Sequence, residues 1–131
     1  MNWTHFAMAL AVSEAAISLS DWIFFGVIFH AKYMTTPEVW RGGSEAKKIA
    51  WSLAVALIGT AGFLFLCVRA GAGGYAGALW LALLVWGAAS LPYSVTNVLF
   101  VKYDPSLALS HSLGWLARLV IAALAYGWLL G

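Results

Sequence analysis

Charge is scarce in this sequence. Asp, Glu, Lys and Arg make up only 9% of its 131 residues, whereas an ordinary soluble domain carries roughly 25%. So few charged side chains cannot cover a water-facing surface, which excludes an ordinary soluble enzyme and a disordered tail. The seven basic residues form no continuous stripe and the formal net charge is only +2, so a nucleic-acid partner is excluded as well.

Cysteine and catalytic motifs are equally scarce. The single cysteine, Cys67, excludes a disulfide framework and a cysteine-based zinc site. No two histidines stand close enough in sequence for a local metal site, and the chain has no Walker loop, no Gly-x-Ser-x-Gly elbow and no metalloprotease helix. No motif indicates a catalytic residue, a metal or a cofactor, so the favoured interpretation is not an enzyme. A haem or chlorophyll held by one histidine would prefer His111.

Apolar residues, by contrast, make up 63% of the chain. A membrane-spanning helix needs about 20 mostly apolar residues. Four such stretches fit residues 5–29, 46–68, 76–100 and 109–130, and they leave no room for a soluble domain. The sequence predicts an all-α fold, with residues 1–131 forming one transmembrane domain, a four-helix bundle in the lipid bilayer.

Basic residues predict the orientation of the bundle, because cytoplasmic loops carry more Lys and Arg than loops on the other side. No basic residue precedes Lys32 and acids lie inside the first stretch, so we expect a retained N-terminus and no cleavable signal peptide. The second loop contributes only Arg69, whereas the first and third contribute Lys32, Arg41, Lys47, Lys48 and Lys102. We therefore expect a multi-pass membrane protein with the first and third loops in the cytoplasm and both termini on the outer side.

Aromatic and small residues predict helix ends and helix contacts. Trp and Tyr prefer the membrane–water interface. We expect Trp3, Tyr75, Trp80, Tyr126 and Trp128 near the outer ends, and Tyr33, Trp40, Trp51, Tyr103 and Trp115 near the inner ends. Small residues at four-residue spacing allow helices to approach closely. They occur at Ala7, Ala11 and Ala15, at Ala56 and Thr60, and at Gly127 and Gly131, and intramolecular packing is the favoured interpretation.

Three ionisable residues lie inside the predicted spans, where a charge is costly and needs a partner. Glu14 and Asp21 share one face of the first span with Ser18, and Arg118 lies near the middle of the fourth. At 1.5 Å per residue, Glu14 is about 5 Å to the outer side of mid-depth and Asp21 about 6 Å to the inner side. We expect this polar stripe to face the bundle interior and Arg118 to pair with at least one acid. A structural ion pair that fixes helix register is the favoured interpretation.

Further polar residues gather in the cytoplasmic half of the third and fourth spans. Pro92 lacks a backbone N–H, so we expect it to kink the third span and to free a carbonyl near Ala88. The candidate polar pocket, opening to the cytoplasm at the depth of Asp21, comprises Ser18, Tyr93, Ser94, Asn97 and His111. The alternative is that the hydroxyls bond their own helix backbone and that Asn97 caps or joins helices.

Two stretches resemble a known family. Residues 22–33 read Trp-Ile-Phe-Phe-Gly-Val-Ile-Phe-His-Ala-Lys-Tyr, and residues 96–100 read Thr-Asn-Val-Leu-Phe. They are similar to the Trp-rich end of the first helix and to the Thr-Asn-x-Leu-Phe segment of domain-of-unknown-function family seventeen sixty-one, a group of small bacterial membrane proteins. Where that family has Tyr-Ser-Pro after the Trp, this chain reads Ile23-Phe24-Phe25. The resemblance implies a four-helix bundle of about this length in the bacterial inner membrane and leaves the activity open.

Three classes of function follow, in this order of preference. The first is an accessory or structural subunit or a small-ligand-binding membrane protein, present as a homo-oligomer or within a larger membrane complex. The second is an oligomeric small-molecule or proton-coupled transporter that uses Glu14, Asp21 and Arg118. The third is a membrane enzyme or cofactor-binding protein that uses Asp21, Asn97 and His111.

Overall fold

Helices form every regular element in the described part of the chain, which covers residues 1–35, 37, 42–102 and 104–131 of a computed structural model. The elements are α1 (Trp3–Ile23), the π-helical turn η1 (Phe24–Ile28), α2 (His30–Met34), α3 (Glu45–Arg69), α4 (Gly74–Val85), the π-helical turn η3 (Trp86–Ser90), α5 (Leu91–Phe100) and α6 (Pro105–Leu129). The predictions made for Trp40, Arg41 and Tyr103 lie outside the described residues.

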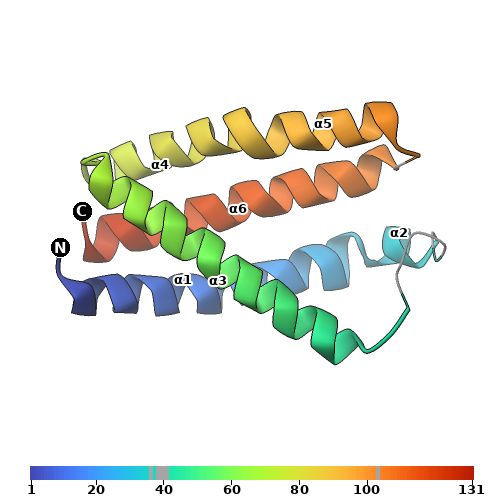
Figure 1. Cartoon of the computed structure of the whole chain (residues 1–131), viewed down its shortest axis with the longest axis horizontal. Helices are drawn as coiled ribbons and strands as arrows, with labels where there is room; N and C mark the ends of the chain where they lie inside the picture. The colour runs from blue at the N-terminus through green and yellow to red at the C-terminus, as the bar shows by residue number, and fades with distance from the viewer. Residues whose placement is uncertain (36, 38–41, 103) are drawn as a thin grey trace.

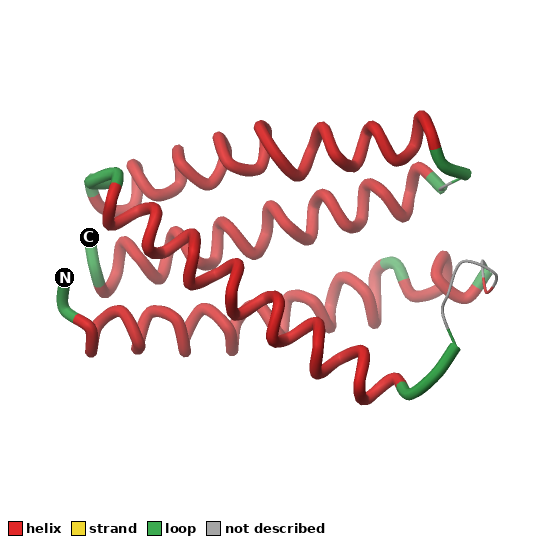
Figure 2. The backbone as a smooth tube through the Cα atoms, in the orientation of Figure 1, coloured by secondary structure: helices red, strands yellow, loops and turns green. Residues whose placement is uncertain are grey.

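The long helices form a bundle with two distinct ends, as Figures 1 and 2 show. Both termini and the α3–α4 turn lie at one end, here named the termini end. Helix α2 and the α5–α6 turn lie at the opposite end, here named the α2 end. Within the described residues, four helical stretches are long and apolar enough to cross a membrane: Trp3–Ile28, Glu45–Arg69, Gly74–Phe100 and Pro105–Leu129. The prediction of an all-α chain with four such helices is therefore confirmed.

The core lies toward the termini end and is rich in small side chains. Helix α6 is its central element, since it contacts α1, α3, α4 and α5. Alanines of facing helices let the backbones approach closely. The buried cluster comprises Ala9, Phe63, Leu64, Cys67, Ala78, Ala82, Leu119, Ala122, Ala123 and Tyr126. Tyr126, predicted at an outer interface, is thus buried, and its hydroxyl donates to the Ala72 carbonyl at 3.0 Å.

Helix α1 turns a different face to the bundle from the one that the sequence predicts. Its buried residues are Ala9, Ser13 and Ile17, which recur every four positions. Ser18 is exposed, because successive residues of an α-helix differ by about 100° and Ser18 therefore points away from Ile17. The predicted small-residue face is also wrong here, since its members are exposed: Ala7, Ala11 and Ala15.

The last helix begins earlier than predicted, at Pro105 rather than residue 109. The Asp104 carboxylate accepts a hydrogen bond from the backbone N–H of Ser106 at 2.8 Å, which satisfies one of the free donors of the first turn. Pro105 suits the first helical position because that residue needs no N–H donor. The connection between the third and fourth helical spans is therefore shorter than the predicted bounds imply.

The third span is distorted close to the place that Pro92 predicts. The distortion is the π-helical turn η3, in which the backbone N–H of Leu91 donates to the carbonyl of Trp86. Ala88 lies within this turn, one helical turn before Pro92. Because proline has no N–H, the ladder of backbone hydrogen bonds loses a donor at this point.

Helix α3 diverges from the bundle toward the α2 end (Figure 1). Its second half packs into the core through Phe63, Leu64 and Cys67. Every residue from 45 to 55 is exposed, and Trp51 is 74% exposed. The divergence leaves space beside α5 and α6, and this space is where the candidate site lies.

Candidate functional site

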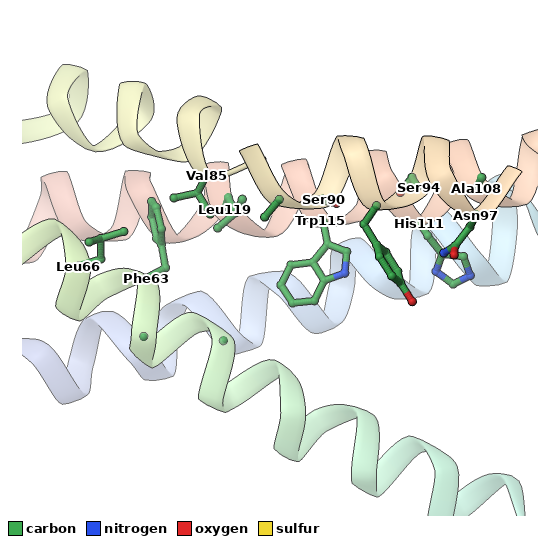
Figure 3. A pocket seen from close by; sticks show the side chains of 14 residues that line it. Phe63, Leu66, Val85, Ser90, Ser94, Asn97, Ala108, His111, Trp115 and Leu119 are labelled. Atoms are coloured by element: carbon green, nitrogen blue, oxygen red, sulfur yellow. The ribbon is translucent and has the colours of Figure 1, made fainter. Parts of the chain in front are cut away.

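A cavity of about 880 Å³ lies between α3, α6 and the span made of α4, η3 and α5. Phe63 and Leu66 contribute apolar walls toward the termini end, whereas Asn97 and His111 contribute polar groups toward the α2 end (Figure 3). The Trp115 ring lies between these two regions. The cavity therefore changes from apolar to polar along the axis of the bundle.

One face of the third span supplies most of the polar lining. Ser90 and Asn97 each stand three or four positions from Tyr93 and Ser94, so the four side chains point in similar directions. Within the described residues, none of these four side chains makes a hydrogen bond, in contrast to Thr60, whose hydroxyl donates to the Ala56 carbonyl at 3.0 Å. The alternative in which these hydroxyls bond their own helix is therefore not what the structure shows.

Ser18 lies apart from the rest of the predicted pocket. Tyr93, Ser94, Asn97 and His111 line the same cavity, whereas Ser18 lines a shallow hollow of about 370 Å³ between α1 and α3. Including Ser18 in the pocket was wrong, because α1 presents its Ile17 face, and not its Ser18 face, to the bundle.

Arg118 forms an ion pair with Asp21, which joins α6 to α1. The guanidinium donates from Nε to Oδ1 at 3.0 Å and from Nη2 to Oδ2 at 2.5 Å. The side chains are only 16% and 23% exposed. Two parallel hydrogen bonds to one carboxylate are the strongest geometry available to arginine, so the pair fixes the relative position of the two helices.

Glu14 is outside this pair. Its Oε1 is buried and has no hydrogen-bond partner in the described part of the chain, and the same holds for the Oγ of Ser13. Glu14 lines the shallow hollow together with Ser18. Of the two acids predicted as partners of Arg118, Asp21 is therefore the one that forms the ion pair.

Trp115 separates the ion pair from the cavity. Its ring lies 5.2 Å from the guanidinium carbon of Arg118, within cation–π distance. On α3 the facing residue is Gly59, where an added Cβ would lie 3.5 Å from the ring. The Trp115 ring thus lines the cavity, and its place at an inner interface stays a prediction.

Helix α2 is held to the beginning of α6 by two sets of contacts. Lys32 Nζ lies 2.9 Å from Asp104 Oδ2. The Tyr33 hydroxyl lies 2.9 Å from the Ser110 Oγ and 3.2 Å from the His111 Nε2. The Ser106 hydroxyl, followed by the Lys32 ammonium, lowers the pKa of Asp104 from 3.8 to about 2, so this carboxylate is charged at neutral pH.

A comparison with known families matches residues 8–127 to the model of a protein of unknown function, DUF1761. The chain belongs to the DUF1761 family. The family that the sequence resembles is thereby confirmed. The matched residues include those that line the cavity and those that form the Asp21–Arg118 pair. No curated protein and no solved structure matches the chain.

Two residues of the site in this DUF1761 protein were not predicted as site residues from the sequence, Trp115 and Tyr33. Trp115 follows His111 by four positions, so helical spacing could have placed both side chains on one face. Tyr33 gave no such signal, because its contact with His111 joins residues 78 positions apart. Among the described residues, no three His, Cys, Asp or Glu side chains group closely enough to hold a metal ion.

Proposed function

We propose that this protein is a multi-pass membrane protein that binds a small amphipathic molecule in the cavity between α3, α5 and α6. One observation carries the proposal, namely the cavity of about 880 Å³ whose wall changes from apolar to polar along its length. A ligand site is usually a largely apolar hollow with a few polar groups that fix orientation. The apolar end suits an alkyl or isoprenoid chain, and the polar end suits a head group.

The unpaired polar side chains favour a head group with hydrogen-bonding atoms. Ser94 and Asn97 make no hydrogen bond within the described residues. An unsatisfied polar group costs several kcal/mol in a hydrocarbon environment, so a bound molecule or water that pairs with them lowers the free energy. Hydroxyl and amide side chains can donate and accept, which suits a hydroxyl-, ester- or carbonyl-bearing head.

The proposal includes a location and an assembly. The α2 end contains Lys32, Lys47, Lys48 and Lys102, whereas the termini end contains Arg69. By the positive-inside rule we propose that the α2 end faces the cytoplasm of a bacterial cell and that both termini face outward across the inner membrane. We further propose that the protein holds its ligand as an accessory component, either as a homo-oligomer or as a subunit of a larger membrane complex.

The decisive test fills the cavity without disturbing the fold. A Cβ added at Gly62, which lines the cavity, or at Gly87, which does not, meets no atom within 4 Å. The protein in nanodiscs is labelled with a monoacylglycerol that carries a photoreactive diazirine in its chain, and the crosslinked residues are mapped by mass spectrometry. Crosslinks at Phe63, Leu66 or Leu119 are expected in the wild type and in Gly87→Phe, and are expected to disappear in Gly62→Phe. Equal labelling in both variants would refute the cavity as the binding site.

A second experiment tests the polar end. Asn97→Leu keeps a similar side-chain volume but removes the amide, and we expect labelling at a given probe concentration to fall by about tenfold. Thr96→Val is the matched control, because Thr96 is its exposed neighbour on α5 and does not line the cavity. Unchanged labelling in Asn97→Leu would show that head-group recognition does not involve this face.

Proton-coupled transport is a second candidate function, and the buried Glu14 Oε1 without a partner favours it. Transport of this kind needs a carboxyl group inside the membrane that can take up and release a proton. In proteoliposomes with an internal pH-sensitive dye, it predicts proton movement that Glu14→Gln abolishes and Gly87→Phe retains. Identical traces for wild type, Glu14→Gln and protein-free vesicles would exclude it.

A further inference from the structure

The polar end of the cavity is connected to α2 by a chain of hydrogen bonds. His111 lines the cavity, and its Nε2 lies 3.2 Å from the Tyr33 hydroxyl. The same hydroxyl lies 2.9 Å from the Ser110 Oγ, and the Ser110 hydroxyl donates to the Leu107 carbonyl at 2.7 Å. Four groups from α2 and α6 are therefore joined by successive hydrogen bonds.

The number of available protons determines which group donates in each of these hydrogen bonds. A serine hydroxyl has one proton, and Ser110 uses it on the Leu107 carbonyl, so Ser110 accepts the proton of the Tyr33 hydroxyl. Tyr33 has no second proton and must accept in its contact with His111. The His111 Nε2 is therefore the protonated nitrogen, and in the neutral ring Nδ1 is the acceptor.

The surroundings keep Tyr33 in place and protonated. Burial raises the pKa of its phenol above the ordinary value of 10.0, so the hydroxyl keeps its proton at neutral pH. The Phe25 ring packs against the His111 ring with centroids 5.4 Å apart, and Lys32 joins the same short helix to Asp104. Each contact limits the movement of α2 or of the imidazole relative to α6.

We propose that Tyr33 is a positioning residue for the cavity, which fixes His111 in one ring orientation and in the Nε2-protonated tautomer at the polar end. An imidazole in a single tautomer presents a fixed pattern of donor and acceptor, whereas a ring that exchanges tautomers presents both. The importance of this pattern for a ligand rests on the proposed function, but the tautomer itself does not.

Nitrogen NMR of histidine-labelled protein in nanodiscs tests the assignment, at about pH 8 where an ordinary imidazole is neutral. We expect a protonated-type shift for Nε2 of His111 in the wild type. Tyr33→Phe removes the acceptor, and we expect both tautomers to become populated. Ser110→Ala removes the Oγ that accepts from the Tyr33 hydroxyl, which releases that proton for Nε2, and the ring is expected to shift toward the Nδ1-protonated form.

Tyr75→Phe is the matched control, because it removes a phenol hydroxyl near the termini end and is expected to leave the His111 signals unchanged. An Nδ1-protonated ring in the wild type, or identical spectra in wild type, Tyr33→Phe and Ser110→Ala, would overturn the assignment. In the photolabelling experiment we expect Tyr33→Phe to reduce cavity crosslinks by about tenfold. If the wild type shows no crosslinks in the cavity, the proposed function fails, while the nitrogen spectra still decide the role of Tyr33.

Discussion

The two ends of this bundle differ in how closely their helices pack. At the termini end, helices approach until glycines touch their neighbours: a Cβ added at Gly127 would lie 2.9 Å from the Cα of Tyr75, and one at Gly131 would lie 2.8 Å from the Cα of Gly74. At the α2 end, α3 diverges and the cavity opens. Polar contacts there join α2 to α6: Lys32 with Asp104, and Tyr33 with Ser110 and His111.

This difference teaches what decides packing when every helix is hydrophobic. Lipid is as apolar as leucine, so apolar character alone does not drive one helix onto another in a membrane. Small side chains do so, since they allow close backbone contact and dispersion forces between many atoms. Ala78 and Ala82 of α4 pack in one cluster with Ala122 and Ala123 of α6 at the termini end. The part of α3 that diverges has large exposed side chains such as Trp51.

The largest expected effect concerns the ion pair between Asp21 and Arg118, near the boundary between the two halves. Asp21→Asn leaves the guanidinium without its counterion, and we expect a loss of about 3 kcal/mol in the free energy of unfolding, because breaking a half-buried pair within the predicted spans leaves one charge uncompensated. Denaturant titration in mixed micelles measures this loss.

The double variant Asp21→Asn/Arg118→Leu separates a structural pair from a functional one. If the pair is structural, removing both charges is expected to restore most of the stability and to leave cavity labelling intact. Full stability in Asp21→Asn alone would contradict the structural interpretation. It would also remove the ion pair as the element that joins α1 to α6.

The next largest expected effect tests the close packing at the termini end. An alanine at Gly127 would place its Cβ 2.5 Å from the Cδ1 of Tyr75 and 2.9 Å from its Cα. A ring can turn away but a backbone atom cannot, so α4 and α6 must separate. We expect Gly127→Ala to destabilise the protein by about 2 kcal/mol in the same titration. A change below about 0.5 kcal/mol would show that the termini end is not tightly packed.

A glycine-to-alanine substitution beside the cavity should have the opposite effect on the free energy of unfolding. Gly62 lies within α3 and lines the cavity, and an added Cβ meets no atom within 4 Å. Alanine favours a helix over glycine by about 0.5–1 kcal/mol, and no clash opposes this gain. Gly62→Ala is therefore expected to raise the free energy of unfolding by that amount. A destabilisation like that of Gly127→Ala would indicate that α3 closes onto the cavity.

Much of the fold could be predicted because it depends on local composition. The length of the apolar stretches predicts four helices, and the structure has them. Depth counting along α1 and α6 brought Asp21 and Arg118 to similar levels, and these two residues form an ion pair. Helical spacing grouped Ser94 and Asn97, which line one cavity. Each of these inferences needs only the helix rise and the cost of a charge in lipid.

The remainder depends on helix rotation, which a single apolar sequence does not determine. Helix α1 has polar residues on more than one face, since Ser13 is buried whereas Ser18 is exposed, so the polar stripe alone did not identify the buried face. Ser18 was therefore expected to face the bundle interior but is exposed. The divergence of α3 and the contact between Tyr33 and His111 depend on how separate helices meet, and local sequence does not contain that information.

The smallest expected effect concerns the polar contacts of the α2 end. Asp104 has a pKa of about 2 against an ordinary 3.8, so its charged form is favoured in the fold. Its contribution is complete above about pH 4 and is lost as the pH falls through 2, and the effect is small because Lys32 is 44% exposed. Spin labels on α2 and α6 should therefore report a constant distance from pH 8 to pH 4 and a looser α2 below. Asp104→Asn can still cap α6 but has no charge, so it should remove the acid-dependent step. Spin labels on α4 and α6 at the termini end should show no acid-dependent change in distance. Loosening that begins near pH 6 would point to a different titrating group and would show that the Lys32–Asp104 pair does not hold α2.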